Sequence, residues 1–319
     1  MRVWLFGADG CSPLEKPDIQ QLLKDESKIF WVDLCNDEEQ TAHVLRDIFQ
    51  FHPLAVEDVL NERQRPKVEE YENNVFAILN PVQFHEKELA FRELDVFVGK
   101  NFIVTIHDGS EDAMVEETLR LINNRATFKL PMSSGYLLYV LVDVMVDSYF
   151  PLLDAIGDHI DEISEAILGA PKTDQLAALF HLKRKLSEMT RVVGQQRDMF
   201  GLITREDEPF INSETLRYYF RDVYDHLLRV NDTVNSYRDN VGSVIDLYLS
   251  SVSNRLNIIV KRLTVVTIAS SALAVITGFY GMNFDQTFPS FDSPWGVPFV
   301  VILMIVVALL VLVLFYKRE

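Results

Sequence analysis

The sequence predicts an α/β domain with αβα layers that continues through a long helical stalk into two C-terminal transmembrane helices. Three observations lead to this fold class. Strand-like and helix-like stretches alternate over residues 1–107, helical patterns alone follow them, and two apolar runs at 263–279 and 297–316 end the chain. Strands mixed with helices and followed by helices alone are typical of a layered domain that feeds a helical region.

Alternating residues, or β-branched and aromatic ones, predict five strands at 1–7, 28–34, 74–84, 91–98 and 102–107. Gly99-Lys100-Asn101 predicts a hairpin turn between the last two. Helices are expected at 37–50, with Asn36 or Asp37 as the cap, and at 54–60, with a polar stretch over 61–67.

Later segments predict a charged helical hairpin. Residues 135–168 indicate one long helix, Pro171 ends the pattern, and residues 173–205 indicate a basic partner helix. The first helix carries an acidic face, which is either solvated or a loose cation-binding surface: Asp154, Asp158, Asp161, Glu162 and Glu165. The opposite charges favour an antiparallel pair.

A helical pattern without proline then runs over 213–280, about 100 Å at 1.5 Å per residue. Its apolar residues step alternately by four and three, which is typical of a coiled-coil seam and requires partner helices. The seam consists of Leu216, Phe220, Val223, Leu227, Val230, Val234, Tyr237, Val241, Ile245 and Tyr248.

Both C-terminal apolar runs have the length of a membrane span, because a helix needs about 20 apolar residues to cross the hydrocarbon core. The positive-inside rule places both termini in the cytosol, since Lys261, Arg262, Lys317 and Arg318 flank the spans and the connecting loop has no Lys or Arg. Residues 1–10 lack the pattern of a signal peptide. We therefore expect a multi-pass protein of the cytoplasmic (inner) membrane, in contact with lipid.

Composition narrows the partners. The net charge of −17 argues against nucleic acid and predicts a cationic partner. Cys11 and Cys35 have no metal-type spacing and are expected to be reduced thiols in the interior. The expected domains are 1–130 (α/β), 131–212 (helical hairpin), 213–262 (stalk), 263–280 (first span), 281–296 (external loop), 297–316 (second span) and 317–319 (basic tail).

A second series of residues follows another face of the stalk helix into the membrane. Polar residues on one face of a span point at a cavity or at a neighbouring helix, whereas small ones also allow close helix packing. Both alternatives stay open, although Asp246 and Asn257 favour a pore. The stripe consists of Asp246, Ser250, Ser253, Asn257, Val260, Thr264, Thr267, Ser271, Ala274 and Gly278.

One such helix per chain cannot enclose a channel, so the pore interpretation requires a ring of subunits. Asn283 would form a ring of amides at the outer mouth, with Gly281 allowing a tight turn beneath it. Amide oxygens suit a hydrated Mg²⁺ ion, which loses its waters reluctantly.

The stretch Tyr280-Gly281-Met282-Asn283 between two apolar spans resembles the signature of the CorA family of magnesium transporters. Further blocks are similar to its other motifs and extend the resemblance from about residue 30 to the end: His52-Pro53-Leu54, Glu57-Asp58, Gln64-Arg65-Pro66-Lys67-Val68, the stretch 219–226 and the stretch 248–254.

This resemblance implies a homopentameric funnel that takes up Mg²⁺ passively, and in many members also Co²⁺ or Ni²⁺. Mg²⁺ would be both the transported ion and a regulatory ligand, without an organic cofactor. The selectivity filter would be Gly281, Met282 and Asn283, and the pore would be lined by the stripe together with Leu263, which with Val260 would form an apolar constriction. Regulatory sites between subunits would use Glu57, Asp58, Asp222 and, as a third contributor, Asp143.

The sequence also departs from the family pattern. Ala272-Leu273-Ala274 stands where relatives often carry Pro-Leu-Thr, so a hydroxyl in mid-pore is left to Ser271. The loop 284–295 lacks the commoner Met-Pro-Glu-Leu, and its Asp285 and Asp292 either gather cations or are merely solvated. One alternative is a Zn²⁺ or Co²⁺/Ni²⁺ transporter on the same fold, and Met282 counts against the zinc transporter. Another is a non-conducting membrane-anchored metal sensor. No enzyme is expected, because His52 and His226 have no evident catalytic partner.

Overall fold

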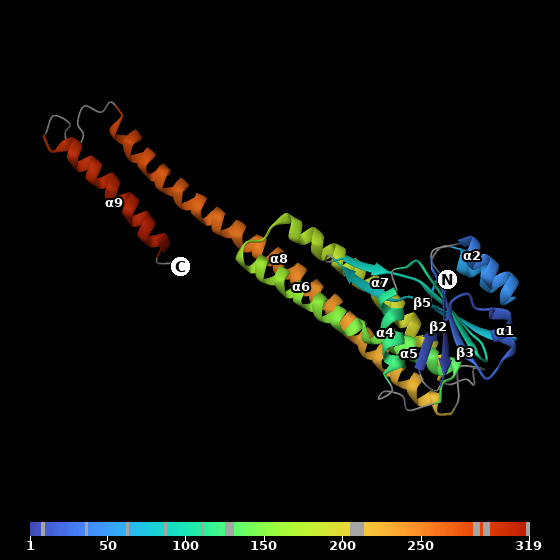
Figure 1. Ribbon diagram of the computed structural model, residues 1–319. Coiled ribbons are helices and arrows are strands. Elements are labelled where there is room, and N and C mark those ends of the chain that lie inside the picture. The colour runs from blue at the N-terminus through green and yellow to red at the C-terminus, as the bar shows by residue number, and fades with distance from the viewer. Residues whose placement is uncertain are drawn as a thin grey trace. The chain divides into compact units, whose positions relative to one another are not determined.

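The computed structural model describes residues 1–7, 10–35, 38–61, 64–85, 88–109, 112–124, 131–204, 214–282, 288–289 and 294–316 (Figure 1). The chain divides into two units. The first comprises Met1–Ala166 and Lys172–Ile245, and the second comprises Ile167–Pro171 and Asp246–Glu319. We describe each unit by itself.

A mixed sheet forms the base of the first unit, with the strand order β2-β1-β3-β9-β8-β5-β4. β3 and β9 run parallel, with Val32 opposite Val104, and the other neighbours are antiparallel. The strands are β1 (Arg2–Gly7), β2 (Gly10–Pro13), β3 (Ile29–Cys35), β4 (Lys67–Tyr71), β5 (Asn74–Leu79), β8 (Leu94–Val98) and β9 (Phe102–His107).

The predicted strands at 1–7, 28–34 and 102–107 are confirmed, as is the hairpin turn, in which Gly99 N–H donates to the Phe102 carbonyl at 3.0 Å. The predictions over 74–84 and 91–98 are wrong in extent. The stretch 74–84 contains two strands, because Pro81 cannot donate to a strand ladder and follows the end of β5. The stretch 91–98 contains β8 and only the last residue of the strand before it. The extra strands β6 (Val82–His85) and β7 (Glu88–Phe91) form a separate antiparallel hairpin. The polar stretch 61–67 leads into β4, which was not predicted.

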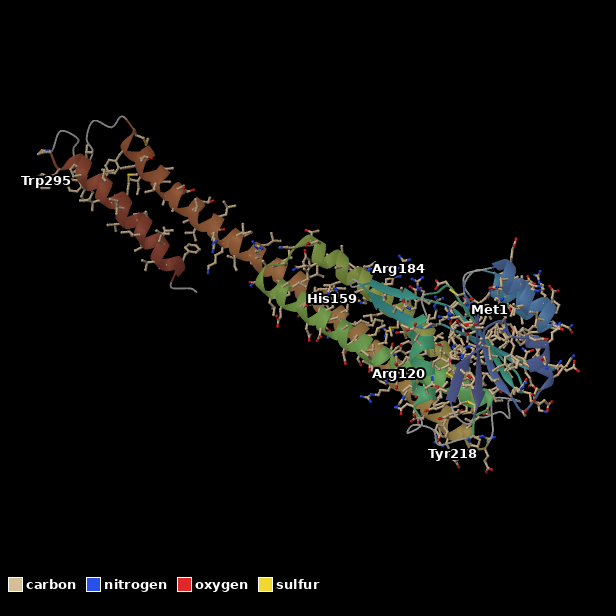
Figure 2. All side chains as sticks on the ribbon, viewed as in Figure 1. Met1, Arg120, His159, Arg184, Tyr218 and Trp295 are labelled. Carbon is tan, nitrogen blue, oxygen red and sulfur yellow. The ribbon has the colours of Figure 1, made fainter. Side chains whose placement is uncertain are left out.

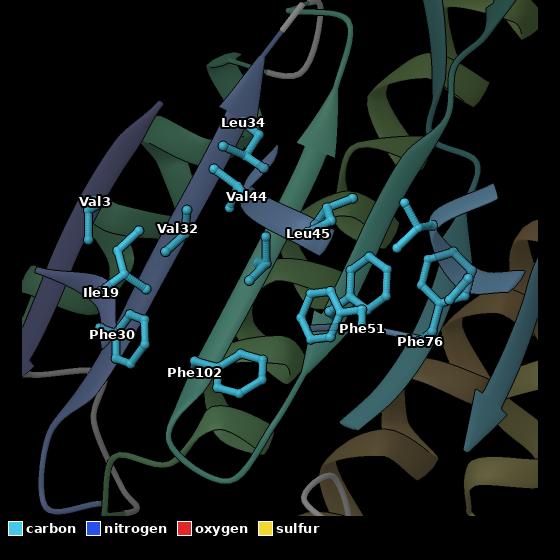
Figure 3. Close-up of a cluster of buried hydrophobic side chains, with 14 of the residues drawn as sticks. Val3, Ile19, Phe30, Val32, Leu34, Val44, Leu45, Phe51, Phe76 and Phe102 are labelled. Carbon is cyan, nitrogen blue, oxygen red and sulfur yellow. The ribbon is translucent and has the colours of Figure 1, made fainter. Parts of the chain in front are cut away.

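Short helices cover one face of the sheet and build the core drawn in Figure 3. They are α1 (Ile19–Lys24), α2 (Glu38–His43), the π-helical turn η1 (Val44–Ile48) and α3 (Pro53–Leu60). The helix expected over 37–50 is therefore α2 followed by η1. Since side chains alternate along a strand, Phe30, Val32 and Leu34 of β3 all face this layer and are buried.

The other face is covered by α4 (Asp112–Asn123) and α5 (Ser134–Asp147), of which α5 contacts β8 and β9. The predicted αβα layering is confirmed. The single helix expected over 135–168 is wrong: α5 ends at Ser148, and α6 (Tyr149–Gly169) begins after it. Pro151 accounts for the break, because proline lacks the N–H of a helix interior but fits the first turn of a new helix.

Helix α7 (Thr173–Ile203) and residues 216–245 of helix α8 (Leu216–Tyr280) complete the first unit. The predicted seam on α8 is confirmed: its positions are buried, except that Tyr237 is half-buried. All five acids predicted on α6 are exposed. The charge complementarity of the hairpin stays a prediction.

Among the described residues, three helical stretches are long and apolar enough to cross a membrane. The apolar window within Ser134–Gly169 is 61% buried, whereas the windows in α8 and in α9 (Gly296–Tyr316) are 0% buried. Figure 2 shows that the side chains along α9 are almost entirely carbon. The first window is therefore part of a protein core, and the two exposed windows belong to the helices in which membrane spans were predicted.

Candidate functional site

Two acids predicted as regulatory ligands, Glu57 and Asp58, lie near the end of α3. This helix starts at a fixed point, because His52 accepts a hydrogen bond from Leu54 N–H through Nδ1 at 3.3 Å and Pro53 occupies the first turn. Both acids line a cavity of about 560 Å³ beside strand β4. Its other lining residues are Leu54, Glu69, Glu70 and Tyr71.

Asp58 already has a cationic partner within the chain. Its Oδ2 lies 2.7 Å from Nζ of Lys67, and the same ammonium lies 2.8 Å from Oε1 of Glu69. The hydrogen bonds and charges of both carboxylates outweigh the desolvation of Lys67 and raise its pKa above the ordinary value. A cation thus bridges these carboxylates, which is the kind of site that a divalent ion also prefers.

A second acidic group joins helices α5 and α8. Ligand atoms of Asp143, Asp147 and His226 all lie within 4.8 Å of one another, close enough to share one metal ion. Asp222, one turn before His226, has Oδ1 at 3.9 Å from its Nε2. The donor set of carboxylates and an imidazole fits a divalent cation, and the imidazole adds affinity for Co²⁺, Ni²⁺ or Zn²⁺ relative to Mg²⁺.

Negative charge is in excess in this group, because three carboxylates surround one imidazole. Burial, together with the charges of Asp147 and Asp222, raises the pKa of Asp143 to about 6. Carboxylates that repel one another become favourable neighbours when a cation lies between them. The structure thus brings together Asp143 and Asp222 as members of one acidic cluster.

Asp58 and Asp222 are not in contact within the described part of the chain. Asp58 pairs with Lys67 beside β4, whereas Asp222 lies next to His226 on α8. If Asp58 and Asp222 share one ion, as the family resemblance implies, the two acids come from different copies of the chain. This arrangement is what an inter-subunit site predicts, and the roles of all four acids stay predictions.

The polar stripe lies in the second unit, on α8, and every one of its members is exposed, from Asp246 to Gly278. The exposure extends to the predicted constriction, where Val260 is 58% and Leu263 64% exposed. These side chains are therefore available either to a pore or to neighbouring helices.

The hydroxyls of the stripe have a defined orientation. Thr264 Oγ1 donates to the Val260 carbonyl at 2.8 Å, and Thr267 Oγ1 donates to the Leu263 carbonyl at 2.9 Å. Each hydroxyl proton is used within the helix, which leaves the oxygen lone pairs as acceptors on an exposed surface. Acceptors of this kind suit the water shell of a cation.

Part of the predicted filter can be placed. Gly281 follows the last residue of α8, and its N–H donates to the Thr277 carbonyl at 2.9 Å. Met282 is 54% exposed. Asn283, Asp285 and Asp292 lie outside the described residues, so their predicted roles have no structural test.

Asp147, His226, Lys67 and Glu69 were not predicted as site residues. A signal for the first two existed, because Asp143 and Asp147, like Asp222 and His226, are four residues apart and so share a helix face. Lys67 and Glu69 share one face of a strand, but Lys67 was assigned to the polar stretch 61–67 and no strand was predicted at 67–71, so this spacing was not used.

Comparison with known proteins identifies what the chain resembles. A family model described as "CorA-like Mg2+ transporter protein" matches residues 26–318. The cobalt/magnesium transport protein CorA of Thermotoga maritima is 35% identical over 307 residues, which cover 95% of this chain and 87% of that protein.

A putative metal ion transporter of Bacillus subtilis is 34% identical over 272 residues, covering 85% of this chain and 81% of that protein. The solved structure of a CorA magnesium transporter from Methanocaldococcus jannaschii has the same fold, with a TM-score of 0.81 and 23% identity, and the match covers 100% of this chain and 98% of that one.

Proposed function

Since the chain belongs to the CorA-like Mg²⁺ transporter family, we propose that it is a divalent-cation channel that takes up Mg²⁺ passively across the cytoplasmic membrane, with both termini in the cytosol. The observation that carries the proposal is the exposed stripe of α8, where hydroxyl and amide side chains run through an apolar helix. Polar side chains within a membrane span face a bundle interior or an aqueous path, and several chains around one axis would supply such a path.

The proposed assembly is a homopentamer in which the second unit of each chain contributes α8 to a central pore. Contacts between apolar side chains of the membrane helices would hold such a ring together. The following apolar side chains are exposed in the single chain: Leu249, Leu256, Val266, Val275, Phe279, Val301 and Leu309. Cyclic symmetry would turn each stripe residue into a ring of identical groups.

Selection of the ion is proposed to occur at the outer mouth. A ring of Asn283 amides would hold Mg²⁺ through its water shell, above the turn that begins at Gly281. Below it, Ser271, Thr267 and Thr264 would accept hydrogen bonds from the hydrated ion. Leu263 and Val260 would then form an apolar constriction, which blocks ions when narrow and conducts when it widens and is wetted.

Control of the pore is proposed to reside in the first unit. Mg²⁺ between Asp58 of one subunit and Asp222 of the next, with Glu57 and Asp143 nearby, would hold the ring closed. The acids repel one another without a cation, so a fall in cytosolic Mg²⁺ would empty the sites and loosen the ring. The channel would thus admit Mg²⁺ when the cell lacks it.

A second candidate function is transport of Co²⁺, Ni²⁺ or Zn²⁺. The observation that favours it is the imidazole of His226 beside Asp143 and Asp147, because nitrogen ligands suit these ions better than Mg²⁺. A non-conducting metal sensor is the candidate from a different class, and the hydroxyl stripe counts against it.

An enzymatic role has little support in the described residues. Cys35 lies opposite His107 in the register of β3 and β9, and Asp33 is nearby. However, His107 accepts from Gly109 N–H through Nδ1 and contacts Asp33 through Nε2, at 3.0 and 3.1 Å. Both ring nitrogens are engaged, so this histidine has no free position at which to act as a base for Cys35.

The deciding experiment is flux in proteoliposomes that contain the full-length protein. We expect uptake of Mg²⁺ with no need for a pH gradient, and loss of uptake in Asn283→Ala. Uptake of Zn²⁺ or Co²⁺ in preference to Mg²⁺ would establish the second candidate instead. Absence of flux for all four ions, Ni²⁺ included, with cation binding retained, would identify a sensor.

A further inference from the structure

The ammonium of Lys67 lies between two carboxylates at the proposed regulatory half-site. Nζ is 2.7 Å from Asp58 Oδ2 and 2.8 Å from Glu69 Oε1. The side chains of Lys67 and Asp58 are only 29% and 24% exposed, so their attraction is screened less than that of a typical surface ion pair. The ammonium is thus already bonded to a carboxylate oxygen that a divalent cation at Asp58 would also bind.

Neighbouring groups hold this arrangement in place. The Tyr71 hydroxyl donates to Glu69 Oε2 at 2.8 Å, which leaves Oε1 of the same carboxylate directed at Lys67. The imidazole of His52 stacks on the Tyr71 ring, with centroids 4.9 Å apart. Nζ of Lys67 lies 5.7 Å from the centre of the Phe76 ring, within range of a cation–π interaction.

The surroundings are acidic, and Lys67 offsets part of this charge through its contacts with Asp58 and Glu69. Glu57, Asp58, Glu69 and Glu70 all line the cavity. Burial, together with the charges of Glu93 and Asp58, raises the pKa of Asp95 well above its ordinary value and so favours the neutral form of this carboxyl. Without Lys67, Asp58 and Glu69 would be left unpaired and mutually repulsive.

We propose that Lys67 is a tethered competitor of the divalent cation at Asp58, an inference that rests on the proposed regulatory role of Asp58. A divalent ion and the ammonium need the same carboxylate oxygen and repel each other, so Nζ gives up its contact with Asp58 and keeps that with Glu69 when the ion binds. Glu69 keeps the ammonium close, and it returns when the ion leaves. Lys67 therefore sets the cytosolic Mg²⁺ concentration at which the site fills.

The test measures the Mg²⁺ concentration that half-inhibits flux, applied to the cytosolic face of full-length protein in proteoliposomes. Lys67→Met removes the competing charge and should lower this concentration by about tenfold or more, the order of effect of one unit charge a few ångströms away. Lys67→Arg keeps the charge and should stay within about threefold of wild type.

Glu69→Gln provides an independent arm of opposite sign. It removes the alternative partner of Lys67, leaves the ammonium on Asp58 and should raise the half-inhibiting concentration. Glu70→Gln is the matched control, because it removes the same charge from the same cavity without removing a partner of Lys67. The effect of Glu69→Gln should exceed that of Glu70→Gln by about threefold or more.

The Mg²⁺-dependent rise in Tm of the same variants gives a second readout of site filling that does not depend on flux. An unchanged or higher half-inhibiting concentration in Lys67→Met, or equal effects of Glu69→Gln and Glu70→Gln, would overturn the competitor role. Asp58→Asn separates this failure from the wider one. If Asp58→Asn leaves inhibition unchanged, the proposed regulatory site itself is wrong; if it weakens inhibition, only the role of Lys67 is lost.

Discussion

The carboxylate of Asp33 accepts a hydrogen bond of 2.6 Å from the hydroxyl of Thr105 across the parallel strands β3 and β9. The same carboxylate is 2.7 Å from a guanidinium nitrogen of Arg2, and the Thr105 oxygen accepts from the Trp31 indole at 2.8 Å. A buried charge is thus fully paired on the sheet face that lies opposite the aromatic core.

Asp33→Asn should strongly destabilise the protein. The side chain of Asp33 is fully buried, and removing one partner of a buried ion pair costs about 3 kcal/mol or more. A unit of this size loses roughly 2–4 °C in Tm for each kcal/mol. Thermal unfolding of full-length protein, followed by tryptophan fluorescence, should therefore show a fall of roughly 6–12 °C. The exposed-site control Glu165→Gln should leave Tm within about 1 °C.

Acid should remove the stabilisation that the ionised carboxylate of Asp33 provides. Although burial alone would raise the pKa of Asp33, the hydrogen bonds and charge of His107, Thr105 and Arg2 hold it below its ordinary value. A depressed pKa contributes stability above the unfolded value of about 4, which is lost as pH falls through the folded pKa. The gap in Tm between wild type and Asp33→Asn should narrow below pH about 4. A gap that is constant down to pH 3 would contradict this account.

Protons should compete with cations at Asp143. Its raised pKa of about 6 means that the ionised form destabilises the metal-free protein above that pH, while protonation blocks a ligand below it. Asp143→Asn should therefore raise the Tm of metal-free protein at pH 7.5. The Co²⁺ concentration that half-saturates the Tm rise of wild type should increase by about tenfold between pH 7 and pH 5.

This increase should be clearly smaller in Asp143→Asn, in which position 143 no longer titrates. The same dependence in both proteins would show that another group, and not Asp143, binds the competing proton.

Asp222→Asn should weaken inhibition by cytosolic Mg²⁺ by about tenfold or more, because it removes one carboxylate of the proposed bridge. Asp232→Asn is the matched control: it lies on the same helix, is also exposed and is not part of the acidic cluster. The measurement is the half-inhibiting concentration in proteoliposomes. Equal inhibition of both variants would exclude Asp222 as a regulatory ligand.

Leu263→Asn should increase flux at inhibitory Mg²⁺ by about tenfold, because a polar ring wets an apolar constriction that otherwise excludes water. Ile258→Asn, five residues from Leu263 and therefore on nearly the opposite face of α8, is also exposed and should change this flux little. If both variants behave like wild type, the constriction lies elsewhere along the stripe.

Local sequence patterns predicted the parts of the fold that depend on local physics. Residue patterns along the chain are enough to predict which side chains of such elements are buried, or how long the element is. This holds for the alternation in β1, β3 and β9, the heptad steps of α8 and the two charge-free runs. Two of the wrong predictions trace to a proline, because Pro81 separates β5 from β6 and Pro151 follows the break between α5 and α6. Strand β4 was missed because Lys-Val-Glu-Glu-Tyr is too polar for a typical strand.

The site was less predictable for a physical reason. Pairings such as Lys67 with Asp58, or Asp143 with His226, join elements that only the tertiary fold brings together. The acids at 57, 58, 143 and 222 came from the family resemblance, since no spacing along the chain connects them. Any pairing of Asp58 with Asp222 depends on a second subunit, which no single-chain pattern encodes.

Strand β4 is the last strand in the order of the described sheet, and its backbone is bonded on one side by β5. Such a margin is a template for unwanted strand addition, which proteins counter with charged side chains. Lys67, Glu69 and Glu70 supply those charges, so the same residues that surround the proposed cation site also keep the sheet from growing. Changes that neutralise all three residues would therefore lower the solubility of the protein as well as change its sensitivity to ions.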